Sequence, residues 1–240
     1  MQNSLLHKRI PTLFGLILLG VGFFAINYAV THTTFFTTKA SPSYSPEEIR
    51  VTNLTDTSFT LSYTTKDNVL GTLSYGTTPS NGKVALDDRD QLSGAPQPYL
   101  IHHITVKNLL PNTTYYYSIN SSDKTFLDGD KAFTSKTLNQ ISQNPSRQAP
   151  IVGTVTNPSG TIDNTIVLLV TDGAQTLSTL VKPDGSFVMP LNALRTSDYS
   201  SYNNFTESSL IKLLVENPNG KSTVSVLASQ INPVPSYRLK

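Results

Sequence analysis

Residues 57–63 read TSFTLSY, a stretch in which bulky and hydroxyl side chains alternate. Phe59, Leu61 and Tyr63 fall on one side of an extended chain, because successive side chains of a strand point to opposite faces. The Ser and Thr residues between them fall on the other side. A period of two residues is typical of a half-buried strand. The stretch therefore predicts a β-strand with one apolar and one polar face.

The same alternation recurs outward from this stretch. Turn signals rich in Gly, Pro and Asn separate the runs. About seven short strands, each apolar on one face, can bury those faces only by pairing two sheets. Residues 46–138 are therefore predicted to form a β-sandwich. The further runs are 49–52, 72–75, 104–106 and 115–119, and the turns are 77–79, 81–82, 111–112 and 128–129.

A motif near the middle of this block carries a family resemblance. Residues 109–115 read LLPNTTY, which fits the Leu-x-Pro-x-Thr-x-Tyr pattern of fibronectin type III domains. The resemblance implies that Tyr115 forms a tyrosine corner, with a buried ring and a hydroxyl bonded to upstream backbone. It also places Tyr63 where most members of the family have Trp.

Two further stretches narrow the resemblance. YGTT at 75–78 and HHITV at 102–106 are similar to the fibronectin-like N-terminal domain of purple acid phosphatases, over residues 46–138. The Asp-x-His and Gly-Asn-His motifs of the phosphatase catalytic domain do not occur in these 240 residues. The resemblance therefore implies a module rather than an activity.

Residues 150–240 are predicted to form a second β-sandwich. The apolar run 166–170 indicates a strand covered on both faces, and NPNG at 217–220 is a strong hairpin signal. The opening Gly-x-Val and KPDGSF at 182–187 resemble the carboxypeptidase regulatory-like sandwich. Residues 191–205 are the longest expected loop.

The N-terminal region contains an uncharged stretch, residues 12–30, which reads TLFGLILLGVGFFAINYAV. Roughly 20 helical residues span a bilayer core, so it is predicted to be a transmembrane signal-anchor helix that contacts the lipid bilayer. Lys8 and Arg9 precede it, which predicts a cytoplasmic flank at 1–11 and extracytoplasmic C-terminal domains. A cleaved signal peptide is the alternative, although the apolar stretch exceeds the usual length.

The complete prediction is an all-β protein with two β-sandwich domains in tandem behind one N-terminal transmembrane helix. Residues 31–45, rich in Thr, Ser and Pro, are expected to form a stalk, and polar residues 139–149 a linker. Whether the second sandwich packs on the first or swings on this linker stays open.

Composition limits the functional classes. Charged residues make up 14% of the chain, against roughly 25% in an average soluble protein, and the net charge is +2. Because no basic cluster occurs, no nucleic-acid partner is predicted. The absence of Cys excludes disulfides and thiol chemistry. An exported β-protein without disulfides fits a bacterial or archaeal cell surface.

The titratable residues suggest no reactive site. His102 and His103 are neighbours in a predicted strand and point to opposite faces, so one is expected at the sandwich rim and one exposed. Asp87, Asp88 and Asp90 are expected to be solvated loop carboxylates, because acidic residues are common in turns. We therefore predict no catalytic residue, no metal site and no cofactor.

Four aromatic residues form the candidate binding surface: Tyr116, Tyr199, Tyr202 and Phe205. Exposed aromatics on loops favour contacts with proteins and sugars, and the alternative is that they cover one end of a sandwich. The predicted function is a non-enzymatic, membrane-anchored binding, adhesion or display module that contacts protein or glycan. An accessory subunit of a cell-envelope or appendage assembly is the second hypothesis, and an enzyme the third.

Overall fold

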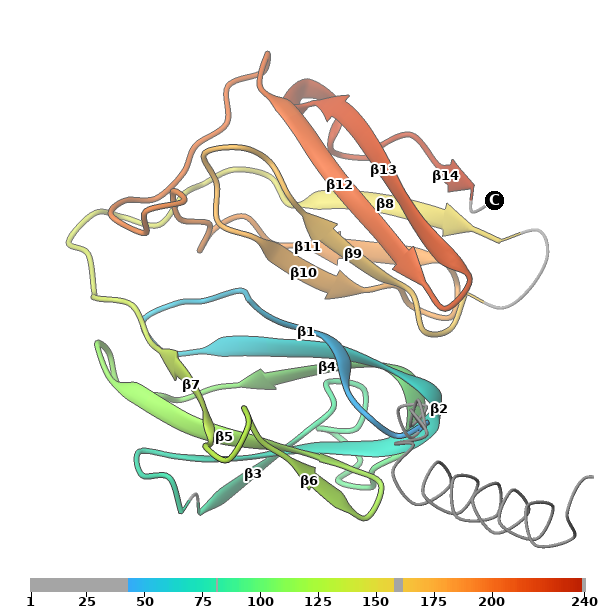
Figure 1. Ribbon diagram of the computed structural model, residues 1–240. Helices are drawn as coiled ribbons and strands as arrows, with labels where there is room; N and C mark the ends of the chain where they lie inside the picture. Colours follow the sequence, from blue (N-terminus) through green and yellow to red (C-terminus); the bar gives the residue numbers. More distant parts are fainter. Residues whose placement is uncertain (1–42, 81, 158–161, 239–240) are drawn as a thin grey trace, which may run out of the picture. The chain divides into compact units, whose positions relative to one another are not determined.

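A computed structural model describes residues 43–80, 82–157 and 162–238. Within these ranges the chain is all-β and contains no α-helix. The predicted membrane segment 12–30 lies outside the described residues. Among the residues that are described, no helix has the length and apolarity needed to cross a membrane. The prediction of an all-β fold built from sandwiches is confirmed (Figure 1).

The first sandwich consists of seven strands. They are β1 (Glu47–Thr52), β2 (Phe59–Gly76), β3 (Lys83–Leu86), β4 (Pro98–Val106), β5 (Thr114–Ser121), β6 (Lys124–Phe126) and β7 (Phe133–Lys136).

The long strand β2 belongs to both layers of this sandwich, and Figure 1 shows it bending between them. Its first half, 59–64, pairs with β1 and β4, and its second half, 69–76, pairs with β3 and β5. The pairing with β4 shifts register between Thr64 and Val69, where the strand passes from one layer to the other. The two runs that the sequence separates, 57–63 and 72–75, are thus one continuous strand.

The core of the first sandwich contains the residues that the alternation selects. Phe59, Leu61 and Tyr63 are buried in one cluster with Tyr115 and Tyr117. The Tyr115 hydroxyl accepts a hydrogen bond of 2.9 Å from the Leu110 N–H. The predicted tyrosine corner is therefore present, and it fixes the chain that enters β5.

The second sandwich has a four-stranded sheet, in the order β10-β9-β12-β13, and a three-stranded sheet, in the order β11-β8-β14. Its elements are β8 (Ile151–Thr156), β9 (Ile166–Leu169), β10 (Leu177–Leu180), β11 (Ser186–Met189), β12 (Leu210–Asn217), β13 (Gly220–Leu227), the 3-10 helix η1 (Ala228–Gln230) and β14 (Tyr237–Arg238).

Its strongest sequence signals are confirmed. All four residues of β9 are buried, as a strand covered on both faces requires. Strands β12 and β13 form the predicted hairpin, with Asn217 opposite Gly220. Gly153 on β8 leaves room for two neighbours, because a Cβ there would lie 2.3 Å from the Val234 side chain and 2.6 Å from Phe187.

The described residues belong to one compact unit, Pro42–Lys240. The segments expected to be a stalk and a linker both make contacts within it. The backbone carbonyl of Tyr44 accepts a 2.6 Å hydrogen bond from the Ser121 hydroxyl. In the segment 139–149, the Ser146 hydroxyl donates to Asn204 and the Gln148 side chain accepts from the Phe205 N–H. These bonds fix both segments against a sandwich.

The tyrosine corner gives a direct test of the fold. Tyr115→Phe keeps the ring but removes the oxygen that accepts from Leu110, so the free energy of unfolding should fall by about 1 kcal/mol. Tyr116→Phe, one residue along the same strand, is the matched control and should leave stability unchanged. Denaturant titration measures both. Equal losses in the two variants would contradict the tyrosine corner.

Candidate functional site

The four aromatic residues of the predicted binding surface lie on two different sandwiches. Tyr116 is on β5 of the first sandwich, whereas the other three lie between β11 and β12 of the second. Tyr199 is 42% exposed, and the Tyr202 ring lies 4.5 Å from the Arg195 guanidinium. Phe205 packs against the second core, so it covers one end of this sandwich. The binding role of this surface stays a prediction.

The predicted exposure of the two histidines is wrong, because both are buried. His102 is 0% exposed and stacks on Tyr63, with ring centroids 4.5 Å apart. A Cβ on Gly71 would lie 2.3 Å from both of these side chains, so the glycine permits the stack. His103 does point to the opposite face, as predicted, but that face is covered by Ser178 of β10.

The predicted solvation is also wrong for two of the three aspartates, whereas Asp88 is half-buried. Asp87 is 1% exposed and Asp90 is 2% exposed. Asp87 accepts hydrogen bonds from both the guanidinium of Arg89 and the backbone N–H of His103. Asp90 accepts from the Tyr99 hydroxyl at 2.7 Å. Buried carboxylates need such partners, and these bonds fix the 87–97 loop to β4.

Asp88 links this loop to the second sandwich through His103. Its carboxylate lies 2.8 Å from His103 Nδ1 and accepts from the Thr105 hydroxyl at 2.6 Å, while His103 Nε2 lies 2.9 Å from the Ser178 hydroxyl. Burial alone would raise the pKa of Asp88, but the bonds from His103 and Thr105 outweigh burial and lower it. The network therefore stabilises the ionised carboxylate.

Burial has the opposite consequence for His102. It disfavours the charged imidazolium and lowers the pKa of His102 to about 4, although Asp87 partly opposes the shift. Burial also raises the pKa of Tyr63, with a further contribution from the charge of Asp87. Both rings of the stack are thus neutral at pH 7.

The hydrogen bonds of Asp87, Asp88 and Asp90 hold parts of the fold together. These carboxylates are occupied by bonds within the fold, and no group of three or more His, Cys, Asp or Glu residues able to hold a metal ion occurs in the described ranges. The network orients the loop and presents no activated nucleophile beside an accessible base.

Sequence reasoning missed the surface along which the two sandwiches pack, which we call the junction. The β1, β2 and β4 face of the first sandwich meets the β9, β10 and β12 face of the second there. Ile101 packs with Ile166 and Leu168, and Val170, Leu180 and Leu214 surround them. The apolar run at 166–170 was the available signal, since the second face of β9 had to be covered by something.

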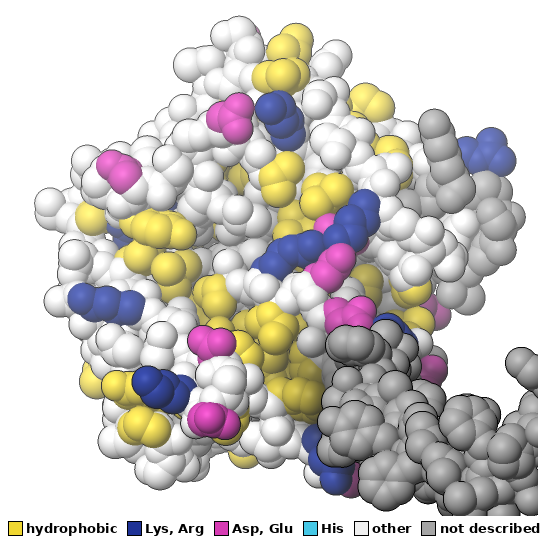
Figure 2. Space-filling view, in the orientation of Figure 1, with side chains coloured by type: hydrophobic (Ala, Val, Ile, Leu, Met, Phe, Trp, Pro, Cys, Tyr) yellow, Lys and Arg dark blue, Asp and Glu magenta, His cyan; other side chains and the backbone are white. Residues whose placement is uncertain are grey.

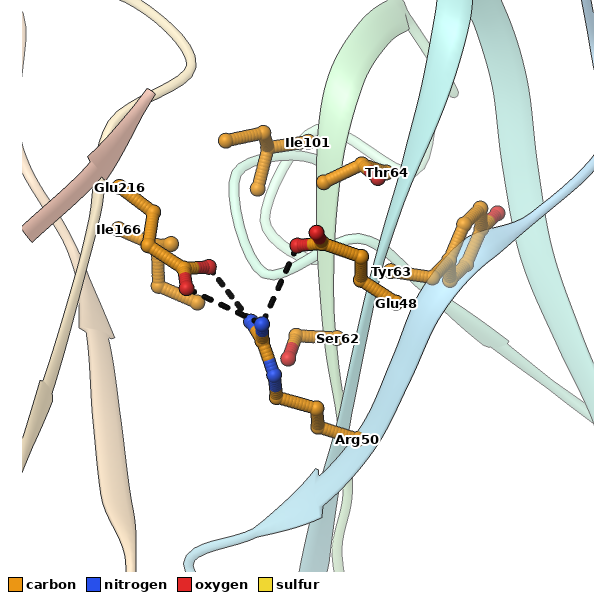
Figure 3. A pocket seen from close by; sticks show the side chains of 8 residues that line it. All are labelled: Glu48, Arg50, Ser62, Tyr63, Thr64, Ile101, Ile166 and Glu216. Atoms are coloured by element: carbon orange, nitrogen blue, oxygen red, sulfur yellow. Dashed lines mark hydrogen bonds and ion pairs between the residues drawn. The ribbon is translucent and has the colours of Figure 1, made fainter. Parts of the chain in front are cut away.

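An ion pair lies beside this apolar cluster (Figure 3). Arg50 of β1 donates two hydrogen bonds to Glu216 of β12, at 2.5 and 3.0 Å, and one to Glu48 at 3.1 Å. The Glu216 side chain is 3% exposed. Lys221 contacts both Glu48 and Glu216. Arg50 thus joins the two sandwiches through a bidentate pair, the strongest geometry available to these groups.

Two asparagines with left-handed backbone complete the junction, one from each sandwich. Asn53, with φ 50°, accepts from the Ser178 N–H at 2.8 Å and donates to the Ser178 carbonyl at 3.0 Å. Asn164, with φ 59°, accepts from the N–H groups of Leu100 and Ile101. Each side chain pairs with a strand of the other sandwich, and Asn tolerates this backbone conformation better than most residues.

Figure 2 shows one face of the molecule, coloured by the type of side chain. Acidic and basic side chains are intermixed over it, and no histidine is visible. The surface on this side carries no basic patch of the kind that binds nucleic acid.

Comparison with known proteins identifies the first sandwich. Residues 46–138 match the family described as the N-terminal domain of purple acid phosphatase. These residues contain the tyrosine corner and the two layers joined through β2. They are a fibronectin type III-like domain. The resemblance of the second sandwich to the carboxypeptidase regulatory-like fold stays a prediction.

Solved structures similar to the chain include arrays of fibronectin type III domains. The chicken CNTN1 FN1-FN3 domains share 14% identity, with 76% of this chain and 64% of that chain covered and a TM-score of 0.29. The central fibronectin-III array of RIM-binding protein shares 14% identity, with coverage of 76% and 59% and a TM-score of 0.26.

A bacterial structure is also similar to the chain. It is the sensor domain of the anti-sigma factor RsgI4 of Pseudobacteroides cellulosolvens, with 25% identity over 42% of this chain and 98% of that chain and a TM-score of 0.28. A search of the curated proteins found no match. A fibronectin type III-like domain suggests a non-catalytic binding or adhesion module.

Because His102 of the fibronectin type III-like domain is buried, we expect the protein to lose stability in acid. The pKa of His102 is about 4 when folded and 6.5 in the unfolded reference, so the unfolded chain binds more protons between these values. Neutral His102 makes its full contribution to the free energy of unfolding above pH 6.5. This contribution, about 3 kcal/mol, is lost as the pH falls towards 4.

His102→Phe keeps an aromatic ring on Tyr63 and removes the titration. Between pH 7 and pH 4 its free energy of unfolding should therefore fall by about 3 kcal/mol less than that of the unsubstituted protein. Urea titrations at several pH values measure the difference. The carboxylates titrate in both proteins, so their effect cancels from the difference between the two pH profiles. Identical profiles would contradict the lowered pKa of His102.

The ion pair at the junction generates a second prediction. Arg50→Met keeps the aliphatic stem but removes two hydrogen bonds to Glu216 and leaves it with Lys221, which should lower the free energy of unfolding by about 2 kcal/mol. Lys212→Met, which breaks the exposed pair with Asp172, is the control and should cost about 0.5 kcal/mol or less.

Combining Arg50→Met with Glu216→Leu removes both charges of the pair. Because the single variant leaves the buried Glu216 carboxylate with Lys221 as its remaining ion-pair partner, the double variant should recover part of the loss. A double variant as unstable as the sum of the two single variants would show that the two residues act independently.

Proposed function

We propose that this protein is a non-enzymatic binding or adhesion module, anchored in a membrane by residues 12–30 and displayed outside the cytoplasm. The observation that carries the proposal is the fibronectin type III-like domain at 46–138 without the phosphatase catalytic motifs. The uncharged stretch at 12–30, preceded by Lys8 and Arg9, supports the anchor and its orientation.

The contacts between the sandwiches support a display role. The apolar cluster, the Arg50–Glu216 pair and the two asparagines join them into one compact unit. A partner that binds such a unit does not have to order two independent domains, so less conformational entropy is lost on binding. The proposed partner is a protein or a glycan at the cell surface, and no catalysis is proposed.

The anchor and its orientation are tested in intact cells that express the full chain. Added protease should degrade residues 46–240 but leave an epitope tag placed before Lys8 protected until the cells are lysed. The protein should also sediment with membranes and resist extraction by high salt. A cytoplasmic marker that survives protease provides the control. Recovery of the intact protein in the soluble cytoplasmic fraction would contradict the proposal.

The binding role is tested by cross-linking the full chain in intact cells, followed by mass spectrometry. Capture of a surface partner that is lost when residues 46–240 are replaced by an unrelated domain would support the module. Capture that persists after this replacement but is lost when 12–30 is exchanged for another apolar helix would favour an assembly subunit that acts through its membrane segment.

A further inference from the structure

A cleft with a volume of about 590 Å³ opens at the edge of the junction. Asn68, Arg89 and Tyr99 line it from the fibronectin type III-like domain. Asp163, Asn164 and residues 180–183 line it from the second sandwich. Its volume lies within the range of roughly 300–1,000 Å³ of small-molecule sites, which occur preferentially between domains.

Two side chains in the wall from the first sandwich, Arg89 and Tyr99, are held in place by bonds within the fold. The Arg89 guanidinium makes two hydrogen bonds to Asp87, donates a third to the Ile101 carbonyl, and lies 3.3 Å from the centroid of the Tyr99 ring. The Tyr99 hydroxyl is held by Asp90. Arg89 and Tyr99 are therefore fixed before a ligand binds, so little conformational entropy of these two side chains is lost when it enters.

The charges in the cleft select against an ionic ligand. Arg89 is neutralised by its two bonds to Asp87 and cannot turn towards an anion without breaking them. The remaining charged residues of the lining, Asp163 and Lys182, are opposite in sign. An anion would face the carboxylate and a cation would face the ammonium group, so an uncharged ligand fits this pair better.

The other groups of the lining favour a ligand with many hydroxyls. The Asn68 amide can donate and accept, the Asp163 carboxylate accepts, and the Lys182 ammonium donates. Pro98 and Leu180 add apolar surface to the same cleft. A pyranose ring offers hydroxyls around its edge and C–H groups on its faces, which matches this mixture.

An extended peptide fits less well. Peptides that bind sheet-like surfaces usually add a strand to a free edge. The backbone N–H groups of Leu100 and Ile101, which would be the donors on this side of the cleft, are already bonded to Asn164. No unpaired strand edge is therefore offered to a peptide by these residues.

We propose that the junction cleft is a binding site for a neutral oligosaccharide, with Asp163, Asn68 and Lys182 as the hydrogen-bonding groups. This deepens the proposed function, because it names a glycan as the class of ligand and assigns its place. It also moves the binding site away from the loop aromatics at 199–205 to a surface that exists only when both sandwiches are packed together.

The test uses the full chain in a detergent without a sugar headgroup. The probes are four trisaccharides, chitotriose, cellotriose, maltotriose and mannotriose, with saturation-transfer NMR to detect binding and calorimetry to measure Kd. At least one should bind, and Asp163→Ala should weaken that binding about tenfold, the effect of losing one charge-assisted hydrogen bond. Asn68→Ala should weaken it about fivefold.

Asp172→Ala is the matched control, because Asp172 is a 94% exposed aspartate of the same sandwich outside the cleft lining. It should leave Kd unchanged. Binding of none of the four sugars, or equal Kd values for the Asp163 and Asp172 variants, would overturn the proposal, as would binding of inorganic phosphate or a charged peptide in place of the sugars. Membrane topology and cross-linked protein partners would be unaffected, so failure here is distinguishable from failure of the proposed function.

Discussion

Packing of the second sandwich onto the β1, β2 and β4 face governs how the polar groups of both sandwiches are paired. That face carries hydroxyls, amides and an arginine, and burial of such groups is unfavourable unless each finds a partner. Three of these groups find partners across the junction: Glu216 for Arg50, and Ser178 for both Asn53 and His103. The buried Ser62 hydroxyl has no partner among the described residues. The second sandwich is therefore part of the environment that makes the first one stable.

The same packing explains the placement of the charged loop at 87–97. The buried Asp87 and Asp90 hold Arg89 and Tyr99 in place, and the half-buried Asp88 orients His103 towards the second sandwich. The 87–97 loop, whose acidic residues are typical of a turn, thereby places Arg89 in one wall of the junction cleft. The bonds that hold Arg89 and Tyr99 in the fold also place them in the cleft. The geometry of the cleft therefore depends on the packing of the two domains.

Much of the fold was predictable from particular residues. The alternation at 57–63 identified the buried face of β2, and the LLPNTTY motif located the tyrosine corner at Tyr115. The apolar run at 166–170 correctly indicated a strand covered on both faces. The junction cleft was not predictable, because its lining combines Asn68 and Arg89 of the first sandwich with Asp163 of the second, which only the packing of the two sandwiches brings together.

The all-β class, the hairpin at 217–220 and the apolar faces of the strands follow from local periodicity and turn chemistry, so they can be read from the sequence alone. Burial of the polar face of β1, β2 and β4 follows instead from the packing of the two sandwiches. Thr60 and Ser62 have the pattern of solvent-facing residues, yet both are buried. Period-two alternation distinguishes the two faces of a strand, but whether a polar face meets water or another domain depends on contacts between residues more than a hundred positions apart, such as Arg50 and Glu216.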